Sequence, residues 1–211
     1  MLTFSECTLV KLDKRFGLKQ IWTSDVLNDW LNADAEIVDW EINLLNLLRE
    51  SLILGVHDWN EFELKQRFVA PIFAMVHFTS DTFNLFAERN FAGTVESIEM
   101  QGKPDGIIAS GVREPEKPYF CFQEYKKERD PKGDPAGQAL AAMLVAQEIN
   151  EHKHPIYGCH AIGDVWRFMT LQDKHYSISG SYAATRDDIF DIFRILKTLK
   201  LIIIALVEKE E

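Results

Sequence analysis

Two short stretches of the sequence carry acidic and basic side chains at a spacing that suits phosphate chemistry. Asp105 begins one expected strand. Glu124 and Lys126 lie two residues apart on the next one, residues 119–126. Alternate side chains of a strand share a face, so Glu124 and Lys126 are expected to point the same way and Tyr125 to the opposite side. If the two strands pair, Asp105 meets Glu124 within reach of one cation.

Two carboxylates that converge on one point repel each other, and a hard divalent cation removes that cost. Mg²⁺ takes oxygen ligands and keeps several waters, so Asp105 and Glu124 are candidate ligands for Mg²⁺ or Mn²⁺. A bound metal lowers the pKa of water and neutralises charge on a scissile phosphate. The ammonium of Lys126 can orient the attacking water or stabilise developing negative charge. These residue types indicate metal-assisted phosphodiester hydrolysis.

The elements that must position these residues are predicted from the hydrophobic period and the turn residues. A helix is expected from Asn60, its N-cap, with a kink or break at Pro71. After it the pattern predicts, in order, strands at 94–100, 105–109 and 119–126, a loop at 130–135, a helix at 136–150, a hairpin at 156–162 and 165–171, and a last helix from 186 to 206.

Residues 1–58 are expected to be helical, with Ser24 and Asp25 capping a short helix and a longer helix ending at Gly55. Trp40, Leu44 and Leu48 recur at near-helical spacing and need an apolar partner. The simpler interpretation is a helical extension that packs on a core of residues 59–211, which makes residues 1–211 one domain. A partner-binding arm is the alternative.

Pro104-Asp105 followed by Glu124-Tyr125-Lys126 resembles the PD-(D/E)xK nuclease superfamily, whose fold is helix, three-stranded meander, helix and strand. The resemblance covers roughly residues 60–171. It implies a mixed α/β (α+β) fold with a restriction-endonuclease-like core, in which a central mixed sheet is flanked by helices. The chain departs from the pattern in one place, a long Phe-rich segment at 78–91 between the first helix and the meander.

The resemblance also implies two further site residues. In restriction-enzyme-type members a helix before the meander carries another acid, and Glu61 falls at the matching place, with Glu63 as the fallback. In the RecB-like branch the helix after the lysine carries a glutamine, and Gln138 matches. By this resemblance the metal ligands are Asp105, Glu124 and Glu61, and Lys126 and Gln138 complete the catalytic set.

The charge of the chain argues against a free-standing nucleic-acid-binding surface. The net charge is −10, with 33 acidic and 23 basic side chains, whereas a protein that grips a polyanion usually carries a basic footprint. Contact with DNA or RNA must therefore come from a local patch, a bound metal or a partner, either another protein or a second copy in a homodimer. Lys126, Lys127, Arg129 and Lys132 form the densest basic stretch beside the site, and a solvated loop is its alternative interpretation.

No stretch reaches the roughly 18 apolar residues of a membrane span. The three cysteines form no C-x-x-C pair, so we interpret them as reduced thiols of a cytoplasmic protein. Three hypotheses remain open. The chain is a metal-dependent nuclease of DNA or RNA, in repair, restriction or mobile-element defence. It is a catalytically inactive member of the same fold that acts as a scaffold. Or it is a structural α+β domain whose charges coincide by chance.

Overall fold

The middle of the molecule is built from segments rich in apolar side chains. The computed structural model describes residues 1–129 and 131–209 and places three such segments side by side, as β6 (Gly106–Ser110), β7 (Glu116–Lys126) and β8 (Ile156–Ile162). Their side chains are mostly buried on both faces, which is the pattern of a sheet with helices on either side. The sheet is mixed, because β7 runs parallel to β8 and antiparallel to β6.

This main sheet extends from its centre to two edges. On one side, β9 (Val165–Gln172) and β10 (His175–Ile178) continue it to the short strand β2 (Lys19–Gln20). On the other side, β3 (Phe83–Ala87) is the edge strand. The order is β2-β10-β9-β8-β7-β6-β3, with β11 (Tyr182–Ala183) paired to β9. The strand that carries Glu124 and Lys126 is therefore an interior strand.

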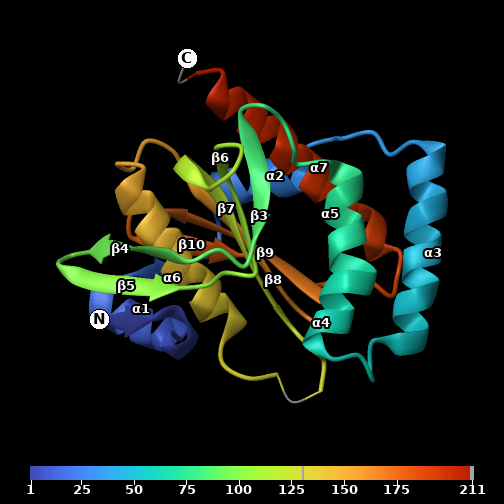
Figure 1. Ribbon diagram of the computed structural model, residues 1–211, viewed down its shortest axis with the longest axis horizontal. Helices are drawn as coiled ribbons and strands as arrows, with labels where there is room; N and C mark the ends of the chain where they lie inside the picture. The colour runs from blue at the N-terminus through green and yellow to red at the C-terminus, as the bar shows by residue number, and fades with distance from the viewer. Residues whose placement is uncertain (130, 210–211) are drawn as a thin grey trace.

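Helices cover both faces of the main sheet (Figure 1). One face carries α6 (Pro135–Ile149) and α1 (Leu9–Phe16), together with a small second sheet of order β1-β5-β4. The other face carries α2 (Asp25–Asn32), α4 (Glu61–Leu64), α5 (Ala70–Val76) and α7 (Asp188–Val207), with α3 (Asp39–Gly55) outermost. The expected mixed α/β class, a large mixed sheet flanked by helices, is confirmed.

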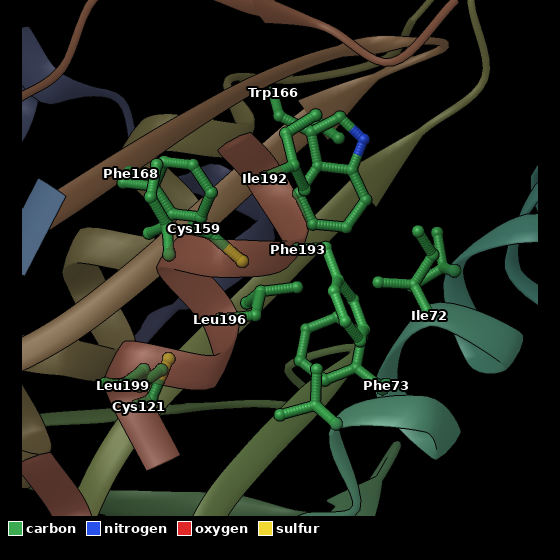
Figure 2. Close-up of a cluster of buried hydrophobic side chains, with 14 of the residues drawn as sticks. Ile72, Phe73, Cys121, Cys159, Trp166, Phe168, Ile192, Phe193, Leu196 and Leu199 are labelled. Carbon is green, nitrogen blue, oxygen red and sulfur yellow. The ribbon is translucent and has the colours of Figure 1, made fainter. Parts of the chain in front are cut away.

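The larger apolar core lies between the sheet and the helices α5 and α7 (Figure 2). Trp166 and Phe168 project from β9 and are fully buried. The ring of Phe73, from α5, stacks on Trp166 with centroids 6.4 Å apart. Helix α7 adds aliphatic and aromatic side chains, among them Ile192, Phe193, Leu196 and Leu199. This core fixes the distance between the sheet and the helix that begins at α4.

Residues 1–58 are mostly helical and lie against the rest of the chain. Trp30 of α2 is buried, and its ring meets that of Phe168 edge-on at 5.3 Å. Leu48 of α3 is buried as expected. Trp40 was expected to need an apolar partner, but its side chain is 57% exposed, because α3 is the outermost helix and only one of its sides faces the core.

The strand expected over residues 94–100 is wrong. The chain forms a hairpin of β4 (Phe91–Val95) and β5 (Ile98–Gly102), and it turns at Glu96-Ser97 with φ angles of 45° and 68°. Turns with two positive φ angles usually contain Gly, Asn or Asp, so the sequence carries no signal for this one. The hairpin pairs with β1 (Leu2–Thr3) in the second sheet and does not join the main sheet.

The strand that pairs with β6 on its outer side is β3, which lies inside the Phe-rich segment 78–91. Leu85 is opposite Ile108 and Phe86 is opposite Ile107 in an antiparallel ladder. The strands β3, β6 and β7 are thus consecutive neighbours in the sheet, and the β4–β5 hairpin is inserted between the first two.

The helix expected from Asn60 is present, but Pro71 does not break it. The side chain of Asn60 accepts the backbone N–H of Glu63, and the carboxylate of Glu63 accepts the N–H of Asn60. After this capping box, residues Lys65–Val69 form a π-helical turn that leads directly into α5. Pro71 lies two residues after this turn, so the lack of its N–H coincides with the interruption of the α-helical hydrogen-bond pattern and the chain stays helical.

The remaining expected elements are close to their predicted places. Helix α6 begins at Pro135, one residue before the expected start, because Asp134 caps it by accepting the N–H of Gly137 at 3.0 Å. The hairpin of β8 and β9 turns at Gly163, whose φ is 58°. The strand β10 was not expected. Asp130 of the predicted 130–135 loop lies outside the described residues.

Candidate active site

The antiparallel pairing of β6 with β7 brings Asp105 beside Glu124. Gly106 is opposite Gln123, so Asp105, one residue before β6, lies next to the following residue of β7. The backbone N–H of Tyr125 donates to Oδ2 of Asp105 at 2.7 Å. The side chain of Asp105 is only 10% exposed, so this hydrogen bond holds its carboxylate in a defined position.

Glu124 and Lys126 share a face of β7, as the strand period predicts. The ammonium of Lys126 donates to Oε1 of Glu124 at 2.6 Å. Tyr125 points to the opposite face and is buried in the larger core. Glu124 and Lys126 do not lie on a solvated sheet edge, because β7 lies between β6 and β8 and the Glu124 side chain is only 9% exposed.

Glu61 reaches the same place from the first turn of α4. Its carboxylate oxygens lie 3.8 Å from Nζ of Lys126 and 3.7 Å from Nζ of Lys65. Glu63, the fallback for this position, is used otherwise: it caps Asn60 and lies 3.4 Å from Arg67. The structure therefore brings Glu61, and not Glu63, to the acids of β6 and β7.

Two residues of this cluster were missed by the sequence analysis. The ammonium of Lys65 donates to Asp105 Oδ1 at 3.0 Å and to Glu88 Oε1 at 2.7 Å. Lys65 follows Glu61 by four residues on a helix, which is a common ion-pair spacing and could have suggested it. Glu88 follows the edge strand β3 at a φ of 49°, and no local signal in the sequence marks it.

Gln138 lies in the first turn of α6 and opens toward Glu124 rather than toward Asp105. Both line a cleft of about 640 Å³, whose other walls come from the N-terminal residues around Phe4, the β4–β5 hairpin and the residues Lys103 and Pro104. Gly133 packs closely on the Gln138 amide, since a Cβ at Gly133 would lie 2.3 Å from its nitrogen. The φ of Gly133 is 79°, a backbone conformation that residues with a side chain rarely adopt. Both this φ and the lack of room for a Cβ therefore require glycine here.

The pKa values of Glu124 and Lys65 are both raised, as expected where carboxylates outnumber the ammonium groups beside them. Burial, and then the negative charge of Asp105, raise the pKa of Glu124 to about 7, although Lys126 acts in the opposite direction. Burial lowers the pKa of Lys65, but hydrogen bonds and charges of Glu88 and Asp105 outweigh it and hold the pKa above its ordinary value. An additional cation near Glu124 would therefore be favourable.

The donor set fits a hard cation chemically, since it consists of carboxylate oxygens. Among residues 1–129 and 131–209, however, no three Asp, Glu, His or Cys side chains are arranged as a set of metal ligands. Two ammonium groups lie among the carboxylates instead: that of Lys65 contacts Asp105, and that of Lys126 contacts Glu124. These ammonium groups stand in for a cation, and a metal would have to displace or share their contacts.

The basic stretch after β7 only partly remains free to meet a polyanion. Arg129 lies 3.2 Å from Asp58, an exposed ion pair, whereas Lys132 is exposed beside the start of α6. In the described part of the chain no helix has the length and apolarity of a membrane span. The three cysteines, Cys7, Cys121 and Cys159, are buried free thiols.

The chain was compared with models of known protein families and with curated proteins, and neither comparison found a match.

Proposed function

We propose that this chain is a metal-dependent phosphodiester hydrolase that acts on DNA or RNA. One observation carries the proposal: where β6 begins and β7 ends, the ammonium of Lys126 contacts Glu124 at 2.6 Å and lies 3.8 Å from Glu61, and Asp105 is near enough to raise the pKa of Glu124. Burial and the charge of Asp105 raise the pKa of Glu124, and groups with perturbed pKa values concentrate at functional sites. The cluster lies beside the cleft of about 640 Å³, a volume within the usual range of ligand sites.

In this proposal Asp105, Glu124 and Glu61 hold Mg²⁺ or Mn²⁺. When bound, the ion supplies Lewis acidity toward a phosphoryl oxygen and makes water easier to deprotonate. Lys126, released in part from Glu124, donates to the phosphate or to the attacking water. Gln138 offers an amide in the adjoining cleft, where it would hydrogen-bond a phosphate or sugar oxygen.

The finer fold assignment belongs to the same proposal. The succession of the α4–α5 helix, the strands β3, β6 and β7, the helix α6 and the strand β8 follows the order of a restriction-endonuclease-like core. Membership of the PD-(D/E)xK superfamily would explain why the acids and the lysine occur at these places. The buried free cysteines are compatible with a reducing cytoplasm.

A specific observation favours a second candidate, an inactive scaffold of the same fold. Lys65 and Lys126 already give each site carboxylate a partner, and the net charge of −10 opposes binding to a polyanion. Charges held in internal pairs of this kind can serve structure alone.

A cleavage screen separates the two candidates. Single- and double-stranded DNA and RNA are incubated at low salt with Mg²⁺ and with Mn²⁺. We expect cleavage of at least one substrate, a loss on the order of 10²-fold or more in Lys126→Ala, and no comparable loss in Lys127→Ala, the neighbour that alternates to the other side of the chain. Equal behaviour of the wild type and Lys126→Ala on every substrate would favour the scaffold.

A further inference from the structure

A second cleft lies on the other face of the main sheet, beside the same acids. It has a volume of about 450 Å³ and lies between the α4–α5 helix and the strands β3, β6 and β7. Its walls are largely apolar and include Val69, Phe73, Leu85 and Tyr125. Asp105 and Lys65 also line it, so the cleft reaches the acid cluster directly.

An aromatic ring borders this cleft without being buried by the fold. Phe62, in the first turn of α4, lines the cleft and is 66% exposed. Glu61 of α4 and Lys65, which directly follows α4, belong to the acid cluster, so the ring is held close to it. A large apolar side chain left in water beside an apolar cleft gains free energy when a flat ligand covers it.

A buried amide in the same cleft lacks a partner. The side chain of Gln123 is 2% exposed, and its Oε1 accepts a hydrogen bond from the hydroxyl of Tyr125 at 3.2 Å. Among the described residues its Nε2 has no nitrogen or oxygen acceptor, and it is directed only to the weakly accepting thiol of Cys121. Gly106 holds the amide in place, since a Cβ there would lie 2.0 Å from Oε1. A leucine would fill this space without the cost of an unpaired donor, so the amide favours a ligand with an acceptor atom.

We propose that this cleft is a nucleobase pocket. A base is a flat ring with apolar faces and carbonyl acceptors at its edge, which matches the exposed ring of Phe62, the apolar walls and the unpaired N–H of Gln123. The inference rests on the proposed function, because it takes the neighbouring carboxylates as the place where the phosphate of the same strand is processed. The base enters on one face of the sheet. The nucleic-acid strand then passes the start of β6, beside Asp105, toward the cleft of Glu124 and Gln138.

The test measures base recognition without cleavage. A fluorescently labelled oligothymidylate and an abasic strand of the same length and charge are titrated with the full-length protein at low salt in EDTA, and binding is followed by anisotropy. We expect the wild type to bind the thymine strand about 5- to 150-fold more tightly than the abasic strand, as for one base stacked on an aromatic ring. Phe62→Ala should remove most of this preference. Trp22→Ala is the matched control, since it deletes an exposed ring beside the opposite edge strand, β2.

Gln123→Leu provides the second variant. It should reduce the preference for the thymine strand, and the side-chain amide resonance of Gln123 in the wild type should shift when the thymine strand, but not the abasic strand, is added. Equal affinity of the wild type for the two strands, no binding of either strand, or an unchanged preference in Phe62→Ala would overturn the pocket. Failure of the proposed function has a different signature: Lys126→Ala and the wild type would then cleave alike while the base preference persists.

Discussion

The ammonium of Lys65 lies 3.0 Å from Oδ1 of Asp105, and the other oxygen of that carboxylate accepts a backbone N–H. A buried carboxylate without such partners would be costly, and here both of its oxygens are satisfied by the fold. The same arrangement makes Lys65 a competitor of any cation that binds Asp105. Two predictions follow from the competition, one for the acid and one for the lysine.

Mg²⁺ or Mn²⁺ should raise the melting temperature of the wild type, because the ion binds the gathered carboxylates of the folded state and binds the unfolded chain poorly. At a concentration of about 100 Kd the stabilisation is about 2.7 kcal/mol. Asp105→Asn should lose most of this response while keeping the shape of the side chain. Thermal scans in EDTA and in each metal measure the shift, and equal shifts in the two proteins would contradict a metal site at Asp105.

Lys65→Met should respond to Mg²⁺ more strongly than the wild type does. In EDTA we expect the free energy of unfolding of the variant to be about 1–3 kcal/mol lower than that of the wild type, since Asp105 loses its charge-assisted donor. The metal then meets no ammonium group at Asp105 and restores the lost stability. Lys174→Met is the control, because it deletes an exposed lysine that pairs with Glu96 far from the cluster. The prediction fails if Mg²⁺ shifts the melting temperature of both lysine variants equally.

Stability should fall in mild acid because of His160, which is opposite Glu124 in the β7–β8 ladder. Burial, and then the charge of Arg167, lower its pKa from 6.5 to about 4, with Asp134 opposing. The folded state thus binds this proton less readily than the unfolded state. Neutral His160 therefore makes its full contribution to the free energy of unfolding above pH 6.5. This contribution, up to about 3 kcal/mol, is lost as the pH falls toward 4.

Urea denaturation at a series of pH values should therefore show a shallower acid slope for His160→Gln than for the wild type. NMR titration provides an independent check of the same group. The imidazole signal of His160, identified by its absence from the variant, should change only near pH 4. A midpoint near 6.5 would show that the site does not hold the ring neutral.

Trp30→Ala should destabilise the whole chain by about 3–5 kcal/mol. The indole N–H of Trp30 donates to the carbonyl of Ile195 at 2.9 Å, and its ring meets Tyr157 and Phe168 edge-on, so the substitution leaves a cavity and removes a hydrogen bond. Trp22→Ala removes an 88% exposed ring and should change the free energy of unfolding by no more than about 0.5 kcal/mol. One cooperative urea transition is expected in each protein, and two transitions would show that the N-terminal helices fold separately.

Local sequence patterns were sufficient where one residue type determines one structural outcome. The alternation around Glu124, Tyr125 and Lys126 predicted correctly which side chain enters the core and which two share a face. The capping residues Ser24 and Asn60 begin helices as expected. These features depend on contacts within a few residues, and the sequence contains all the necessary information.

Features that depend on distant contacts could not be predicted in the same way. Lys65 forms ion pairs with Glu88 and Asp105, which follow Lys65 by 23 and 40 positions in the sequence. Only the folded chain brings these residues together. The strand β3 has the apolar composition of a buried segment, and nothing local shows that it pairs with β6 across the inserted hairpin. The turn at Glu96-Ser97 adopts a conformation that its residue types disfavour, which is why one strand was predicted where two exist.

The π-helical turn at Lys65–Val69 separates two roles of one helix, which are to position the site residues Glu61 and Lys65 and to pack Ile72 and Phe73 against the core. A turn closed by i→i+5 bonds holds one more residue than an α-helical turn, and each residue of an α-helix accounts for about 100° of rotation. The extra residue therefore sets the angular phase of Glu61 and Lys65 independently of Ile72 and Phe73, which face the core. Deleting one residue from this turn would leave the core-facing half docked and swing the site-facing half away from Asp105. The two halves of the helix thus have independent orientations about its axis, and the length of the π-helical turn decides whether Glu61 of α4 lies near Asp105.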